Sequence, residues 1–138
     1  MSAKRFSAAT SQPSRSQAMQ RELAQLNQEG GFTTSVLTNS DGLALAVASS
    51  SRGRFAEILA AVAPLVQRMV QRSNERAGLA SAREVVVDND DRSRLVCRFF
   101  NAGEEMLILA CIVPEQLGHR RAMNRAVAAL QALWTTGR

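Results

Sequence analysis

Apolar residues recur along this chain with two periods, which predict the segments that are helices and the segments that are strands. Recurrence every three or four residues is typical of helices with one buried face, whereas alternation or a short apolar run is typical of strands. The predicted helices cover residues 16–28, 54–76 and a last segment that begins at Glu115. The predicted strands cover residues 33–37, 43–47, 84–88, 94–100 and 106–113. The predicted order is therefore α-β-β-α-β-β-β-α.

The first two predicted strands are joined by Asn39, Ser40, Asp41 and Gly42. The side chains of Asn, Ser and Asp can bind the neighbouring backbone, and glycine accepts a positive φ, so this segment favours a tight turn. We interpret it as a β-hairpin, with Asp41 and Gly42 as turn residues rather than a catalytic pair.

The run from Glu105 to Val113 is apolar on both faces after its first residue. A strand with two apolar faces lies in the middle of a sheet and is covered by helices on both sides. We therefore expect an α/β (α+β) fold in which a five-stranded, mainly antiparallel sheet lies between helical layers.

The long predicted helix, residues 54–76, has a wide apolar face beside a band of small residues. The large apolar residues span an arc of roughly 140°, wider than a minimal amphipathic stripe. They are expected to pack on the sheet, while Ala56, Ala60 and Ala63 allow a second helix to approach closely. Pro64 lacks an N–H donor, so a bend is expected there. The less favoured alternative is a separate helix that begins at Pro64.

Length and composition predict one domain with a basic N-terminal tail. The chain has 138 residues, of which 46% are hydrophobic, enough for one core. Residues 16–136 form the predicted domain. Residues 1–15 are rich in serine and poor in acidic residues, and we expect them to be disordered; a transit peptide of similar composition is the less favoured alternative. No apolar run indicates a secretory signal or a membrane span.

The net charge of +5 is concentrated near the N-terminus, which argues against a nucleic-acid-binding face. Lys4, Arg5, Arg15 and Arg21 all precede the first acidic residue, Glu22. The rest of the chain is therefore nearly neutral. A nucleic-acid-binding domain usually gathers basic and aromatic side chains on one folded face, so we expect no nucleic-acid partner.

Cys97 and Cys111 fall in the fourth and fifth predicted strands. If a turn at residues 101–103 joins these strands, Cys97 faces a residue near Ile108 or Leu109. Cys111 would then lie several residues along the ladder, too far for a disulfide. Both are predicted to be buried, reduced thiols, which is typical of a cytoplasmic protein.

Few residues of the chain are suited to catalysis or metal binding. The only lysine, Lys4, lies in the tail, which excludes a GxxxxGK[ST] phosphate-binding loop and a lysine Schiff base in the domain. The only histidine, His119, is expected to be exposed, and the neighbouring Arg120 and Arg121 disfavour the imidazolium that a general base must form. Asp88–Asp91 lacks calcium-loop spacing and is interpreted as a solvated turn. We predict no catalytic residue, cofactor or metal.

Two groups of arginines are possible docking sites for a protein partner. Arg68, Arg72 and Arg76 recur along one side of the long helix. A solvated helix face is the favoured interpretation, and docking of an acidic partner is the functional alternative. Arg52 and Arg54 lie in a predicted loop, where arginine often serves solubility; an arginine finger for another protein's GTPase site is the less favoured alternative.

From Glu22 to Trp134 the chain resembles a Roadblock (dynein light chain) domain, close to the bacterial MglB-like branch. The resemblance rests on the order of the elements and on four segments. These segments are Leu23–Leu26 (LAQL), Val36–Leu45 (VLTNSDGLAL), Glu84–Val87 (EVVV) and Met106–Ala110 (MLILA). The resemblance implies strand order 2-1-5-4-3, with the long helix on one face of the sheet and the terminal helices on the other.

The resemblance also implies a homodimer, in which the third strands pair across a two-fold axis and the long helices pack together. The implied interface residues are Phe55, Ala56, Leu59, Ala60, Val62, Ala63, Val66, Glu84, Val85, Val86, Val87 and Asp88. Roadblock domains regulate or scaffold small Ras-like GTPases. Bacterial members act on Mgl-type GTPases, often without an arginine finger, by repositioning the GTPase's own switch residues.

We therefore expect a non-enzymatic, cytoplasmic homodimer that activates or modulates a small Ras-like, Mgl-type GTPase. The alternative is a non-catalytic dimeric scaffold that recruits a motor, a kinase or a membrane complex. An enzyme is the least favoured hypothesis, because the sequence offers no catalytic constellation.

Overall fold

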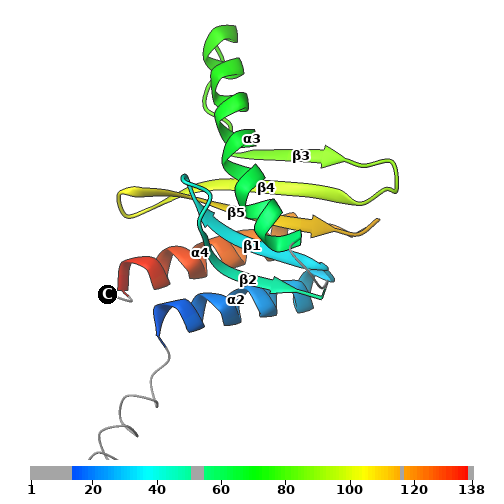
Figure 1. Cartoon of the computed structure of the whole chain (residues 1–138), viewed down its shortest axis with the longest axis vertical. Coiled ribbons are helices and arrows are strands. Elements are labelled where there is room, and N and C mark those ends of the chain that lie inside the picture. Colours follow the sequence, from blue (N-terminus) through cyan, green and yellow to red (C-terminus); the bar gives the residue numbers. More distant parts are fainter. Residues whose placement is uncertain (1–13, 51–54, 116, 137–138) are drawn as a thin grey trace, which may run out of the picture.

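The computed structural model describes residues 14–50, 55–115 and 117–136, and within them it contains three helices and five strands. The helices are α2 (Arg15–Gly30), α3 (Phe55–Ala77) and α4 (Arg120–Thr136). The strands are β1 (Thr34–Asn39), β2 (Ala44–Ser49), β3 (Glu84–Asp88), β4 (Arg94–Ala102) and β5 (Glu105–Val113). Their order along the chain is the predicted one (Figure 1).

β5 occupies the centre of the sheet, as its two apolar faces predicted. The strand order is β2-β1-β5-β4-β3, and every neighbouring pair is antiparallel. Residues 107–111 of β5 are fully buried. The strand order that the resemblance implied is therefore confirmed, and β5 contributes side chains to the cores on both faces.

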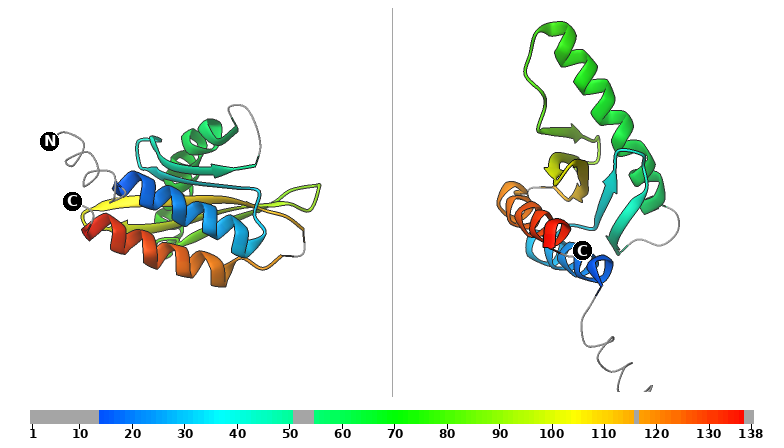
Figure 2. Two further views of the ribbon diagram at one scale, coloured as in Figure 1. Left: turned by 90° about the horizontal axis from the view of Figure 1, so that it is seen from below. Right: turned by 90° about the vertical axis from the view of Figure 1, so that its left-hand side faces the viewer.

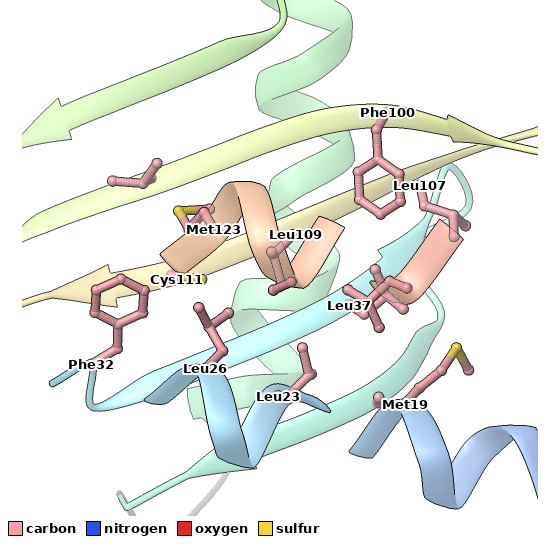
Figure 3. Packing of buried hydrophobic residues seen from close by; sticks show 14 of the residues in the cluster. Met19, Leu23, Leu26, Phe32, Leu37, Phe100, Leu107, Leu109, Cys111 and Met123 are labelled. Carbon is pink, nitrogen blue, oxygen red and sulfur yellow. The ribbon is translucent and has the colours of Figure 1, made fainter. Parts of the chain in front are cut away.

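α2 and α4 lie side by side on one face of the sheet and cover the larger core (Figure 2). Leu23 and Leu26 of α2 belong to the same buried cluster as Leu109 of β5 and Met123 of α4 (Figure 3). These side chains are fully buried. Because burial of a leucine or methionine side chain stabilises a fold by about 1.5–3 kcal/mol, this layer holds the two helices to the sheet.

Polar contacts fix the ends and the outer surfaces of these two helices. The Ser14 hydroxyl accepts a hydrogen bond from the Gln17 N–H at 3.1 Å, and the Gln17 side chain accepts one from the Ser14 N–H, which forms a capping box. Arg125 of α4 forms ion pairs with Glu22 and Glu29 of α2, both at 2.9 Å.

α3 lies on the opposite face of the sheet and packs on it mainly through small residues. Its buried residues are Leu59, Ala60, Ala63 and Pro64. The expectation that the large apolar residues face the sheet and the alanines face a partner is therefore wrong except for Leu59, because the small side chains let the helix approach the strands closely. α3 also continues through Pro64, so the alternative of two separate helices is wrong.

The turn between β1 and β2 has the chemistry that the sequence predicted. The side-chain oxygen of Asn39 accepts hydrogen bonds from the N–H groups of Asp41 and Leu43, both at 3.0 Å. Gly42 has a φ of 84°, and a Cβ there would lie 3.6 Å from the carbonyl oxygen of Ala60. Asp41 and Gly42 are thus confirmed as turn residues.

α4 begins at Arg120, later than the predicted start at Glu115. Gly118 interrupts the helical pattern, and the carbonyl of His119 accepts the first helical hydrogen bond, from the Met123 N–H at 3.0 Å. Leu117, which the pattern placed in the buried stripe of this helix, lies before it and is 39% exposed.

The two cysteines are closer in the sheet than predicted, yet they cannot form a disulfide. Cys97 pairs with Ala110, and Cys111 pairs with Val96, because β4 extends to Ala102 and shifts the register from the predicted one. Their side chains lie in the cores on opposite faces of the sheet. Both thiols are free and buried, as predicted, and burial raises the pKa of Cys97 to about 11 and that of Cys111 to about 12.

Replacement of Leu109 by alanine should lower the free energy of unfolding by about 2–5 kcal/mol, because it removes a fully buried side chain from the middle of β5. Urea unfolding followed by circular dichroism measures this change. Leu43→Ala is the matched control: Leu43 is 62% exposed, and its truncation should cost less than about 0.5 kcal/mol. Equal losses in the two variants would contradict the central position of β5.

Candidate interaction surfaces

The outward face of α3 carries a row of exposed apolar side chains. They are Phe55, Ile58, Val62, Leu65 and Met69, with exposed fractions of 42%, 59%, 38%, 57% and 66%. Their spacing alternates between three and four residues, which is the pattern of a helix that packs along another helix. We call these five residues the α3 seam. The described part of the chain does not cover it.

The implied interface residues of α3 fall on two sides of the helix. Phe55 and Val62 belong to the exposed seam, and Ala56 and Val66 are half-buried. The buried members of the predicted set, Leu59, Ala60 and Ala63, contact the sheet of the same chain. Sequence reasoning omitted Ile58, Leu65 and Met69 from the interface, although the alternating spacing would have grouped them with Phe55 and Val62.

The second half of α3 extends beyond the sheet (Figures 1 and 2). Arg68, Arg72 and Arg76 lie along it and, together with Leu65 and Met69, line a hollow of about 880 Å³. Arg68 donates a hydrogen bond to the carbonyl of Ser40 at 3.2 Å. Within the described residues, Arg72 and Arg76 have no hydrogen-bond or ion-pair partner. The hollow is thus bordered by both positive charge and apolar surface.

β3 forms an open edge of the sheet, whereas the other edge is partly covered. β3 pairs only with β4, and its Val86 and Val87 are 45% and 39% exposed. At the other edge, side chains of α2 bind the backbone of β2: Gln20 accepts from the Val47 N–H at 3.0 Å, and Asn27 donates to the Ala48 carbonyl at 2.9 Å. An uncovered edge strand can pair with a further strand.

The other predicted interface residues of β3 are Glu84 and Val85, which are half-buried, and Asp88, which is exposed. The proposed arginine-finger residues, Arg52 and Arg54, lie outside the described residues, as does most of the predicted tail. No helix among the described residues is both long and apolar enough to cross a membrane.

Solved structures with the same architecture come from MglB proteins and from a Roadblock/LC7 domain. MglB of Myxococcus xanthus is 11% identical, with a TM-score of 0.77 over 89% of this chain and 92% of that one. An MglB with a tetrameric arrangement is 18% identical, with a TM-score of 0.78 over 92% and 95% of the two chains. A Roadblock/LC7 domain from Streptomyces avermitilis is 21% identical, with a TM-score of 0.64 over 85% and 92%.

The chain has the Roadblock fold. No protein-family model matches the sequence, and neither does any curated protein. The fold likeness extends over nearly the whole domain, so the element order and the strand order expected from the resemblance are both confirmed.

Within this Roadblock fold, a cluster of charged side chains joins β3 to the start of α4. Glu84 accepts hydrogen bonds at one carboxylate oxygen from Nε and Nη2 of Arg98, at 2.9 and 2.7 Å. Its other oxygen lies 3.2 Å from Nε2 of His119. His119 is only 9% exposed. The prediction of an exposed histidine is therefore wrong, because the tertiary structure places β3 and β4 against the residue that precedes α4.

This cluster stabilises the charged form of Glu84. Partial burial opposes ionisation of the carboxyl, but the hydrogen bonds from Arg98 and His119 outweigh it and lower the pKa of Glu84 from 4.5. At neutral pH, Glu84 of β3 is therefore an ionised carboxylate with a structural role and not a proton donor.

The described residues of this domain do not assemble a catalytic or metal-binding constellation. No group of three or more His, Cys, Asp or Glu side chains in the described part is placed to hold a metal ion. The buried thiols of Cys97 and Cys111 have raised pKa values and are weak nucleophiles.

The acidic cluster at Asp88–Asp91 lies at the β3–β4 turn. There the Asp91 carboxylate accepts hydrogen bonds from the Ser93 backbone N–H and hydroxyl, at 3.0 and 2.6 Å.

Glu84→Gln should lower the free energy of unfolding at neutral pH by about 1–3 kcal/mol, because it weakens charge-assisted hydrogen bonds. Since the folded pKa is lowered from 4.5, the contribution of Glu84 is present above that value and is lost as the pH falls through the folded pKa. The difference between the variant and the wild type should therefore shrink in acid. Denaturant unfolding at a series of pH values measures it. Glu105→Gln, at an exposed position, should change little at any pH.

Proposed function

We propose that this protein is a homodimeric regulator of a small Ras-like GTPase of the Mgl type, acting in the cytoplasm. The observation that carries the proposal is the pairing of an uncovered apolar seam on α3 with an open edge at β3, on a Roadblock fold that lacks a catalytic constellation in its described residues. Regulation by docking needs such surfaces and needs no chemistry from the regulator itself.

The uneven cover of the sheet supports a dimer. α3 contacts mainly β1, β2 and β5, so it leaves the same face of β3 and β4 without a helix. On that face, Val85 and Leu95 are half-buried, and Val87 is exposed. A second copy joined through β3 can place its own α3 near this area. The pairing would bury apolar surface at both the strand edge and the helix seam, as an isologous interface does.

The spacing of the α3 seam defines how two such helices can pair. Phe55 and Met69 lie equally far from Val62, and Ile58 and Leu65 lie on either side of it. In an antiparallel pair centred on Val62, all five seam residues of one copy meet seam residues of the other. The same arrangement leaves Arg72 and Arg76 beyond the paired region, where they remain open to a different partner.

Val62→Asp and Val86→Lys should each convert the dimer into monomers, because a charge would be buried in the seam or at the strand edge. Multi-angle light scattering of the purified full chain measures the mass. Leu117→Asp is the control, since this exposed leucine lies at the end of α2, on the face opposite α3, and its change should leave the dimer intact. A dimer that survives both interface substitutions would contradict the proposed interface.

The basic end of α3 is the proposed docking site for the GTPase. Arg72 and Arg76 lie beyond the seam residues that pair in the dimer, so they leave a basic surface at the end of the helix that an acidic partner would fit. In this mechanism the regulator supplies contacts that reposition the switch residues of the GTPase. An arginine finger from Arg52 or Arg54 is the less favoured alternative.

Adding the full chain to the GTP-loaded small Ras-like GTPase from the same organism should raise the single-turnover hydrolysis rate by about ten- to a hundredfold, whereas a gain of about 10³ to 10⁵ would indicate an arginine finger. The double variant Arg72→Glu/Arg76→Glu should lower the association rate at low salt by about tenfold, because it reverses the steering charge.

Arg92→Glu is the matched control for charge reversal, because Arg92 lies at the exposed β3–β4 turn, away from the α3 hollow. It should leave association and hydrolysis nearly unchanged. Absence of both binding and stimulation with the wild-type chain would contradict the proposed function.

A dimeric scaffold is the second candidate, and the open β3 edge is the observation that favours it, since pairing of two β3 strands would form a composite sheet whose surface can recruit a partner. A scaffold would bind its partner equally well whether a GTPase carried GTP or GDP, and hydrolysis would not change. Equilibrium binding to both nucleotide forms, measured beside the hydrolysis assay, separates the two functions.

A further inference from the structure

The only histidine of the chain lies between a carboxylate and a guanidinium. Nε2 of His119 is 3.2 Å from an oxygen of Glu84, and Nδ1 is 3.4 Å from Nη1 of Arg94. His119 is 9% exposed, and it belongs to the segment that leads into α4. The two ring nitrogens therefore face partners of opposite chemistry.

This arrangement selects one form of the imidazole. A carboxylate only accepts hydrogen bonds, and a guanidinium only donates them. Nε2 must therefore carry a hydrogen toward Glu84, while Nδ1 must present its lone pair toward Arg94. Only the neutral Nε2–H tautomer satisfies both contacts at once.

Protonation of the ring removes the hydrogen bond that Nδ1 accepts from Arg94. When Nδ1 takes up a proton from water, its new N–H points at an N–H of Arg94, and two positive charges face each other. The contact with Glu84 becomes an ion pair and is retained. Arg94 must therefore withdraw from the ring, while His119 stays bound to β3.

Arg94 also holds the segment before α4. Its Nη2 donates a hydrogen bond to the carbonyl of Leu117. Leu117 in turn covers the end of α2, where a Cβ added to Gly31 would lie 2.8 Å from its Cδ1. A change at Arg94 is thus transmitted to the contact between Leu117 and α2.

Several charged groups surround the ring. The charged groups facing His119 or its surroundings are Glu84 of β3, Arg94 and Arg98 of β4, Glu29 of α2, and Arg120, Arg121 and Arg125 of α4. A histidine side chain usually changes charge between about pH 5 and 8, which is the range that matters in cells.

We infer that His119 is a proton-controlled latch, which holds Arg94 and the segment before α4 in place when neutral and releases Arg94 when protonated. The inference does not rest on the proposed function or on a dimer. It concerns contacts within one chain, and it predicts that acidification loosens Leu117 and Gly118 while β3 remains attached through Glu84.

Because His119 is the only histidine, ¹⁵N-histidine labelling of the full chain gives one pair of ring signals. In the wild type above the titration, the ¹⁵N shifts should report the Nε2–H tautomer alone. Arg94→Ala should produce a mixture of tautomers and move the titration midpoint to higher pH by roughly 1 unit, because it removes both a donor and a positive charge. An Nδ1–H tautomer in the wild type would overturn the inference without any variant.

Arg120→Ala is the matched control, because it removes an adjacent positive charge that makes no hydrogen bond to the ring within the described structure. It should leave the tautomer unchanged and move the midpoint much less than Arg94→Ala does. Equal shifts in the two variants would show that general charge, rather than the Arg94 contact, acts on the ring, and would overturn the latch.

Amide hydrogen exchange tests whether protonation of His119 loosens the segment before α4. After correction for the intrinsic pH dependence of exchange, protection of the Leu117 N–H, which donates to the carbonyl of Pro114, should fall by about tenfold as the wild-type ring becomes protonated, a moderate local opening. In Arg94→Ala the protection should be low at both pH values. Wild-type protection that does not follow the ring titration would overturn the proposed release.

Discussion

Burial of β5 on both of its faces is the constraint on which the rest of this fold depends. A strand that is apolar on both sides needs a helical layer above and below it, and the neighbouring strands must pair with both of its edges. The short connections and the antiparallel pairing then place β1 and β4 beside it, with β2 and β3 at the edges. Both helical layers are therefore needed because both faces of β5 must be buried.

The two layers do not cover the sheet equally, and the difference separates structural from interaction surfaces. α2 and α4 together cover one face and enclose the larger core. On the other face, α3 is alone and packs through Leu59 and small residues, so Phe55, Ile58, Val62, Leu65 and Met69 point outward. On this face of the sheet, the part that α3 does not cover stays open. Three surfaces adjoin this open part: the α3 seam, the β3 edge and the basic end of α3.

The side chains of Glu84, Arg98, His119 and Arg94 connect the open edge to the opposite layer. Glu84 is part of β3, yet its carboxylate is held by β4 and by the residue before α4. Beyond its backbone pairing with β4, the edge strand is thus held to the domain by charge-assisted hydrogen bonds rather than by a deep apolar core. Such contacts respond to pH, whereas the apolar contacts of β5 do not. A change of pH is therefore expected to act on the contacts between β3, β4 and the residue before α4.

Local sequence determined the element types, the β1–β2 turn and the central position of β5, because periodicity, turn chemistry and two apolar faces are properties of neighbouring residues. The resemblance added the strand order. Only the tertiary structure decided which face of α3 packs on the sheet, since both the alanines and the large apolar residues repeat with helical period. It also decided the burial of His119 and the register of Cys97 and Cys111, because these depend on contacts between segments far apart in the chain.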